Sequence, residues 1–197
     1  MIENVLTRHF PAPEINRKEI LRYSGAGKSE EYDSIIEDCL NDLSDSLHYS
    51  VCYREFPVVF GEDGFCSLGF TDIKSKGVSR LLEKSDRLVL FAATVGLAPD
   101  IYAKKYSKIS PVKSLFAESI GDERVEALCG DFCTFFEKEY GVRLTPRFSP
   151  GYGDLPLDVQ KDIFKYLNPG KHIGLTLSDS LIMTPVKSVT ALAGIIR

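Results

Sequence analysis

The segment RLVLFAATVG, residues 87–96, constrains the fold more than any other part of the chain. Its apolar residues run on without the alternation of a half-exposed strand, which indicates a strand buried on both faces. A β-rich segment at 49–60 ends at the turn GEDG and leads into a return strand at 65–73, which predicts a hairpin. Helical patterns are mixed among these strands without a regular strand–helix–strand rhythm. The sequence therefore predicts an α+β fold with an antiparallel sheet.

Helical patterns cover much of the remaining chain. One short helix is expected to end near Gly25, and the next is expected to begin with Ser29 as its N-cap. A long helical region spans 99–140, and a later helix begins near Pro156 and stops at the sequence NPG. The tail, 172–196, contains two β-like runs around a proline. The apolar positions that share one face of the last part of 99–140 are Val125, Leu128, Phe132, Phe135, Phe136 and Tyr140.

Charge and cysteine content narrow the class of protein. Lysine and arginine total 24 against 28 aspartate and glutamate, a net charge of −4, so no basic surface for a nucleic acid is expected. Five cysteines without a CxxC motif favour a reduced, cytoplasmic setting over a disulfide framework. The N-terminus lacks a signal-peptide layout, and no apolar run has the length of a membrane span. We expect a single domain, 1–197, without linkers or repeats.

Several short patterns resemble known phosphate-binding or metal-binding motifs only in part. The sequence GAGKS, 25–29, resembles the end of a P-loop, but Arg22 stands where that pattern needs glycine. A glycine helix stop followed by a serine cap explains these residues better. Cys129 and Cys133 lie one helical turn apart and could share a metal, yet no further histidine or cysteine is near, so buried apolar thiols are favoured. No metal site, catalytic triad or general base is expected, so the protein binds a ligand or its chemistry needs none of these.

The stretch RFSPGYGDLP, 147–156, places one arginine and one tyrosine in a turn rich in glycine and proline. Pro150 pushes Ser149 toward an extended conformation. The glycines on either side of Tyr152 permit backbone angles closed to other residues and let a ligand approach the main chain. Arg147 offers a planar fork that suits a carboxylate. The arginine, the aromatic ring and the accessible main chain together suit the binding of an amino-acid nucleoside. The alternative is an ordinary loop with a surface arginine.

The same stretch, together with IGLTLSDSLIMTPVKSVTALAG at 173–194, resembles the reactivation domain of cobalamin-dependent methionine synthase. That family carries an arginine, then PGY, then a helix, then a segment like GMxLTESxAMxPxxSVSG. The upstream sequences LFAATVGLAPD and GDERVEALCGDF are also similar to the family. The resemblance covers about 88–195, whereas the N-terminal helical and hairpin part, 1–87, matches only loosely.

The resemblance implies an α+β fold with a curved, mainly antiparallel sheet flanked by helices, and a site for S-adenosylmethionine. By position, Arg147 would hold the methionine carboxylate and Tyr152 would face the corrinoid. An acidic residue on the preceding long helix would hold the α-amino group. Asp122 and Glu126 are both candidates because residues four apart share a helix face, and Glu126 is preferred. The turn residues that would present main-chain groups to the ligand are Ser149, Pro150 and Gly151.

The resemblance also implies a function as a stand-alone component of a methyltransferase (methionine synthase) system. Such a protein supports reductive reactivation, the methylation of Co(I) cobalamin, in a cobalamin-dependent methionine synthase or related corrinoid methyltransferase. The sequence has no DxHxxG cobalamin signature and no flavin or iron–sulfur motif, so a partner would carry the cobalamin and an external donor would supply electrons. The sequence GDLPLDVQ replaces the histidine-containing segment that follows GY in the family. The alternative is a non-catalytic module that docks on a corrinoid protein or senses S-adenosylmethionine.

Overall fold

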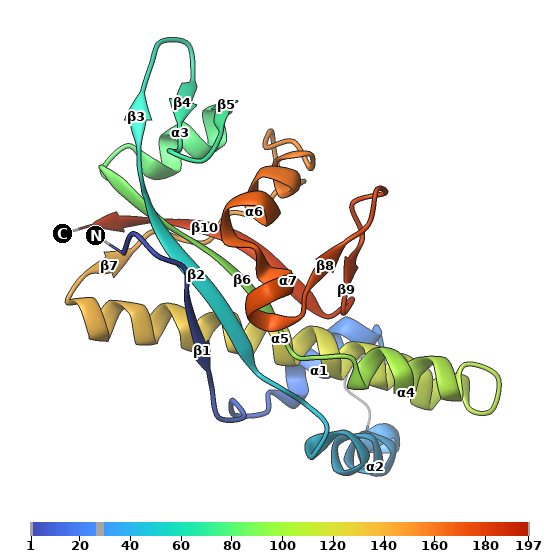
Figure 1. Ribbon diagram of the computed structural model, residues 1–197. Coiled ribbons are helices and arrows are strands. Elements are labelled where there is room, and N and C mark those ends of the chain that lie inside the picture. Colours follow the sequence, from blue (N-terminus) through green and yellow to red (C-terminus); the bar gives the residue numbers. More distant parts are fainter. Residues whose placement is uncertain (1, 27–29, 197) are drawn as a thin grey trace.

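The main sheet is the centre of the computed structural model, which describes residues 2–26 and 30–196. Its strands are antiparallel in the order β1-β2-β6-β10-β7, and the sheet is curved, with helices on both faces (Figure 1). The strands are β1 (Leu6–His9), β2 (Ser50–Pro57), β6 (Arg87–Thr94), β7 (Arg143–Leu144) and β10 (Ser188–Ile196). The predicted α+β class with an antiparallel sheet is therefore confirmed.

Strand β6 lies between β2 and β10, and every one of its residues is buried. Phe91, for example, lies opposite Tyr53 of β2 and Ala191 of β10. This position explains the continuous apolar run, because a strand with neighbours on both edges and helices on both faces has no exposed side.

Alternate residues of β6 pack into two different hydrophobic cores. Leu90 belongs to the core that contains side chains of α3 (Lys76–Leu82) and α6 (Val159–Leu167). Phe91 belongs to the core on the opposite face, which is formed with α5 (Pro111–Tyr140). The period-two alternation of side chains along a strand thus places one layer of helices on each face of the sheet.

A third core surrounds the first half of α5, away from the sheet. It is formed with α1 (Arg17–Ser24), α2 (Asp33–Ser44) and α4 (Ala98–Tyr106), which lie together at one end of the molecule (Figure 1). Helix α1 ends at Gly25, as predicted, and this glycine has a left-handed conformation. A short 3-10 helix, η1 (Glu30–Tyr32), precedes α2, and the predicted cap Ser29 lies outside the described residues.

The helical region predicted over 99–140 is two helices rather than one. Residues 107–110 separate α4 from α5, and Ser110 caps α5 by accepting a hydrogen bond from the Lys113 N–H at 3.5 Å. Pro111 follows at the first position of α5, where its missing N–H costs nothing. A serine cap and a proline at the start of a helix therefore interrupt a pattern that reads as continuous from its apolar spacing.

The helix that was expected to begin near Pro156 also differs from the prediction in its first residue. It starts at Val159 rather than near Pro156, and Asn168 ends it in a left-handed conformation. The NPG sequence does not end all helical structure, because α7 (Pro169–Ile173) begins directly after Asn168.

The remaining strands form two small sheets. The predicted hairpin is confirmed only in part. Val59–Phe60 of the segment 49–60 pairs with the return segment, which carries two strands rather than one, whereas Ser50–Pro57 belongs to the main sheet as β2. The first β-like run of the tail is itself a hairpin that precedes β10. These strands are β3 (Val59–Phe60), β4 (Phe65–Ser67) and β5 (Asp72–Lys74) in one sheet and β8 (Thr176–Leu177) and β9 (Met183–Thr184) in the other. None of the helices in residues 2–26 and 30–196 combines the length and apolar character that crossing a lipid bilayer requires.

Candidate functional site

The turn between β7 and α6 holds the glycine-flanked tyrosine. Gly151 and Gly153 both have positive φ, 87° and 56°, the left-handed region that favours glycine. The Gly151 N–H donates to the Leu155 carbonyl at 2.9 Å, and the Tyr152 N–H donates to the Ser149 carbonyl at 3.2 Å. Tyr152 is 70% exposed. The glycines therefore close the turn and leave the phenol ring at the surface.

The turn is anchored on one side by Asp154, a residue that the sequence analysis did not single out. Its carboxylate accepts hydrogen bonds from Ser75 Oγ at 2.5 Å, from the Lys76 N–H at 2.7 Å and from the Gly77 N–H at 3.3 Å, all at the start of α3. The hydrogen bond from Ser75 is the main cause that lowers the pKa of Asp154, and these main-chain donors act in the same direction. Because the bonds join positions far apart in sequence, no local pattern predicts them.

The other side of the turn is joined to the main sheet. Phe148 exchanges both main-chain hydrogen bonds with Leu192 of β10, each at 2.9 Å. Together with the Asp154 anchor, this pairing holds the turn at both ends. A turn that is fixed in this way would lose little further conformational entropy on contact with another molecule.

Arg147, at the start of this turn, forms an ion pair with Glu126 of α5. Arg147 Nη2 donates to Glu126 Oε2 at 2.9 Å, and the two side chains are 28% and 44% exposed. Burial lowers the pKa of Arg147, but Cys129, which is ionised at the alkaline pH where an arginine titrates, and the Glu126 carboxylate outweigh burial, so that the pKa of Arg147 is raised. The arginine is therefore a permanent cation, and this hydrogen bond uses one of its five N–H donors.

The second acidic candidate, Asp122, has a different partner. Its carboxylate accepts a hydrogen bond from Lys187 Nζ at 2.8 Å. Lys187 packs so closely that a Cβ on Gly121 would lie 2.6 Å from its Cγ. The structure therefore brings Glu126 to Arg147 and joins Asp122 to the start of β10.

Two adjoining clefts surround the turn. The larger, about 550 Å³, contains Arg147 and Glu126, and the smaller, about 240 Å³, contains Pro150; Glu126, Ser149 and Tyr152 line both. Of the site residues predicted from the sequence, Gly151 and Asp122 line neither cleft. The smaller cleft also contains Gln160 and Thr190, which the sequence analysis did not consider.

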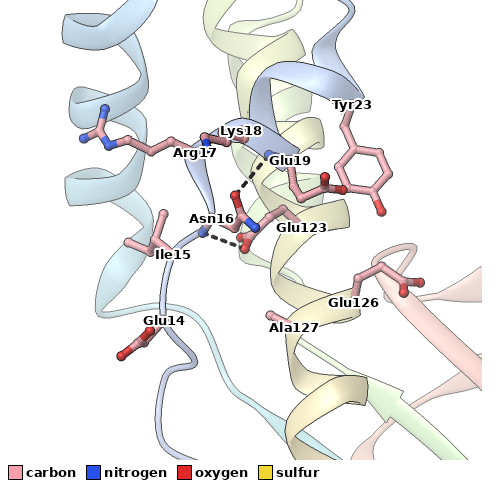
Figure 2. A pocket seen from close by; sticks show the side chains of 10 residues that line it. All are labelled: Glu14, Ile15, Asn16, Arg17, Lys18, Glu19, Tyr23, Glu123, Glu126 and Ala127. Carbon is pink, nitrogen blue, oxygen red and sulfur yellow. Dashed lines mark hydrogen bonds between the residues drawn. The ribbon is translucent and has the colours of Figure 1, made fainter.

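A third hollow, about 650 Å³, is also lined by Glu126 and lies between α1 and α5 (Figure 2). Tyr23 stands beside Glu126 with its hydroxyl turned toward the carboxylate (Figure 2). Burial and the negative charge of Glu126 raise the pKa of Tyr23. At the other end of the hollow, the Asn16 N–H donates to Glu123 Oε1 at 3.0 Å. Glu126 is thus a side chain that all three cavities share.

The cysteines beside the site are free thiols. Burial raises the pKa of Cys129 to about 12 and that of Cys133 to about 11, so both thiols are protonated at neutral pH. In residues 2–26 and 30–196, no group of three or more His, Cys, Asp or Glu side chains is arranged to hold a metal ion. The site is thus made of a cation, a carboxylate, an exposed ring and main-chain groups.

Comparisons with known proteins agree with this architecture. No family model matches the chain, and no curated protein matches it significantly. Among solved structures, a crystal structure of the MetH reactivation domain bound to AdoHcy matches with a TM-score of 0.71 and 16% sequence identity. The match covers 98% of this chain and 78% of that one. The chain therefore has the fold of the MetH reactivation domain, with the curved antiparallel sheet and flanking helices that the resemblance implied.

Proposed function

We propose that this protein binds S-adenosylmethionine at the Arg147–Glu126 pair. Its role is to support the reductive reactivation of a cobalamin-dependent methionine synthase or a related corrinoid methyltransferase. The observation that carries the proposal is an arginine and a glutamate, 2.9 Å apart, that both line a cleft of about 550 Å³. A cleft of this size lies in the range of small-molecule sites.

The ion pair is complementary to the zwitterionic end of an α-amino acid. The ligand carboxylate accepts from Arg147 through charge-assisted hydrogen bonds, and the ligand ammonium donates to Glu126. Each protein charge then exchanges its present partner for one of opposite sign on the ligand, so neither is left unpaired. The neighbouring hollow of about 650 Å³, which shares Glu126, offers room for the nucleoside.

The chemistry assigned to this chain is binding and orientation. S-adenosylmethionine is an activated methyl donor, and the corrinoid of the partner, in its Co(I) state, supplies the nucleophile. The residues of this chain need only hold the methyl donor in line and exclude water. Tyr152 is suited to contact the corrinoid of the partner, because its ring is exposed beside both clefts. Reduction depends on an external electron donor.

Calorimetric titration with S-adenosylmethionine tests the proposal. We expect Arg147→Ala to weaken binding about 10- to 100-fold, the loss of a hydrogen bond to a charged group. Arg143→Ala, which removes an exposed arginine of β7 outside the three cavities, is the matched control and should bind as the wild type. Absence of heat with the wild type, or unchanged binding by Arg147→Ala, contradicts the proposal.

A second assay separates methyl transfer from binding alone. The protein is mixed with S-adenosylmethionine, a low-potential reductant and a partner loaded with cob(II)alamin. The spectrum of methylcobalamin should appear only when this protein is present. Binding without that spectrum supports the alternative, a docking or sensing module, to which the replacement of the family's histidine-containing segment by GDLPLDVQ also points.

A further inference from the structure

A buried ion pair lies beside the hollow between α1 and α5. Arg124 is 1% exposed and Glu123 is 3% exposed, and both belong to α5. The guanidinium donates to both carboxylate oxygens, from Nε to Oε2 at 2.5 Å and from Nη2 to Oε1 at 2.6 Å. Side chains of adjacent helix residues ordinarily point about 100° apart, so this pairing needs two long side chains that bend toward each other. The two charges therefore act as one unit.

The ion pair holds the segment that leads into α1. The chain between β1 and α1 forms neither helix nor strand. Arg124 donates from Nη1 to the Pro13 carbonyl at 2.6 Å and from Nη2 to the Glu14 carbonyl at 2.7 Å. Glu123 Oε1 accepts from the N–H of Asn16 at 3.0 Å, and Asn16 is itself the N-cap of α1. One ion pair thus binds three main-chain groups within four residues.

The same segment forms one wall of the hollow. Glu14, Ile15 and Asn16 line it, and we call these three residues the wall segment (Figure 2). All three are exposed, Ile15 by 50%, whereas Ile20 of α1 is buried in the third core. Packing therefore fixes α1 on α5, and the hydrogen bonds to the ion pair fix the wall segment.

The cost of burying two charges points to a role other than stability. Removal of both charges from water offsets most of their attraction, and well-packed apolar residues of similar volume often give equal or greater stability. We propose that Glu123 and Arg124 are positioning residues that hold the wall segment in the conformation that receives the nucleoside of S-adenosylmethionine, an inference that rests on the function proposed above. They act through the wall segment, because each carboxylate oxygen of Glu123 already accepts from Arg124. A wall that is fixed in advance spares the ligand the entropy of ordering it.

This role separates the two ends of the ligand. The turn that begins at Arg147 is held by the bonds of Asp154 to the start of α3 and of Phe148 to β10. Release of the wall segment should therefore weaken contacts with the nucleoside and spare those with the amino-acid end. A purely structural role of the ion pair would affect both ends or neither.

The test compares S-adenosylmethionine with L-methionine, which lacks the nucleoside, by calorimetry and by NMR titration. The double variant Glu123→Leu/Arg124→Met removes both charges together, so neither is left buried without a partner. Its affinity for S-adenosylmethionine should fall about tenfold, since the ligand must then order the wall segment itself. Its affinity for L-methionine should stay unchanged. The matched control is Asp158→Ala/Lys161→Ala, which removes an exposed ion pair at the start of α6, outside the three cavities, and should change neither affinity.

Amide hydrogen exchange measured by NMR gives a readout that needs no ligand. In the wild type the Asn16 amide should exchange slowly although its residue is exposed, and in the double variant it should exchange at least about tenfold faster. The amides of β6 should stay protected in both proteins, which shows that the variant is folded. In the wild type, S-adenosylmethionine should further slow exchange in the wall segment and L-methionine should not. This last comparison tests the inference even if the double variant does not fold.

Other outcomes overturn the inference in distinguishable ways. Equal losses of affinity for both compounds would make the ion pair a support of the whole site rather than of the wall segment. Unchanged affinities in a folded double variant, or an Asn16 amide that stays protected there, would show that other contacts hold the wall segment. If the wild type binds neither compound, the proposed function itself fails and this inference fails with it. If the wild type binds S-adenosylmethionine without any slowing of exchange in the wall segment, the inference alone is wrong.

Discussion

Asp122 and Glu126 lie one helical turn apart on α5 and pair with different cations. Asp122 accepts from Lys187 at 2.8 Å, whereas Glu126 accepts from Arg147 at 2.9 Å. Lys187 is nearly buried, so its pairing serves the fold, while Arg147 and Glu126 line a cleft. Two carboxylates that look equivalent in the sequence thus have separate surroundings, and their substitutions should have separate effects.

Substitution of each carboxylate by its amide tests this separation. Glu126→Gln should weaken S-adenosylmethionine binding about tenfold or more, because the ligand ammonium loses a charged acceptor. Asp122→Asn should leave this affinity unchanged. It should lower the free energy of unfolding by about 1 kcal/mol, because the charge of Lys187 loses its partner. The loss is no larger because water screens the exposed side of the pair. Calorimetry and urea denaturation measure the two quantities. If Asp122→Asn weakened binding and Glu126→Gln did not, Asp122 rather than Glu126 would be the ligand-binding carboxylate.

Removal of the Tyr152 ring should affect methyl transfer more than binding. Because the side chain is 70% exposed, Tyr152→Ala should change the free energy of unfolding by less than about 0.5 kcal/mol. Its affinity for S-adenosylmethionine should stay near that of the wild type, while the rate of methylcobalamin formation with the cobalamin-loaded partner falls. Tyr152→Phe, which keeps the ring, should retain the rate if stacking matters. A larger loss of binding than of rate would place the ring on the methyl donor.

The Asp154 anchor predicts a pH dependence of stability. Its pKa in the folded protein is lowered, so the ionised carboxylate stabilises the fold above the ordinary aspartate pKa, and this contribution is lost as the pH falls through the folded-state pKa. Asp154→Asn should therefore be less stable than the wild type at pH 7, and the difference should shrink as the solution is acidified below about pH 4. Denaturant titrations at a series of pH values measure this. Ser75→Ala, which removes the main donor, should weaken the same dependence. A difference that stays constant down to pH 3 would exclude the anchor as its cause.

Two glycines of α5 should respond in opposite ways to alanine. A Cβ on Gly121 would lie 2.6 Å from Lys187 Cγ and 3.0 Å from Pro99 Cβ, so Gly121→Ala should cost about 1–3 kcal/mol by overpacking. A Cβ on Gly130 meets nothing within 4 Å, so Gly130→Ala should gain about 0.5–1 kcal/mol from higher helix propensity. Urea denaturation of both variants gives the comparison. Equal changes would show that the contact with Lys187 adjusts freely.

Much of the fold could be predicted because its signals are local. The unbroken apolar run of β6 indicated a strand buried on both faces, and the spacing of Val125, Leu128 and Phe132 indicated the buried face of α5. The break at 107–110 was missed because the apolar spacing continues across it, although the pair Ser110–Pro111 was a signal that could have revealed it. The assignment of ligand-binding roles to Arg147 and Glu126 stays a prediction.

The presence of a tight turn at 147–153 and the periodicity of β6 and α5 could be inferred from the sequence alone, because allowed backbone angles and side-chain faces depend on neighbouring residues. Tertiary structure alone decided that Arg147 meets Glu126 and that Asp154 accepts hydrogen bonds at the start of α3. These pairings depend on how far α5 and α6 are shifted and rotated against the sheet. A helix turns by 100° and rises 1.5 Å per residue, so a shift of one residue would bring other side chains to the site. Core packing over the whole chain sets that position, and no short segment encodes it.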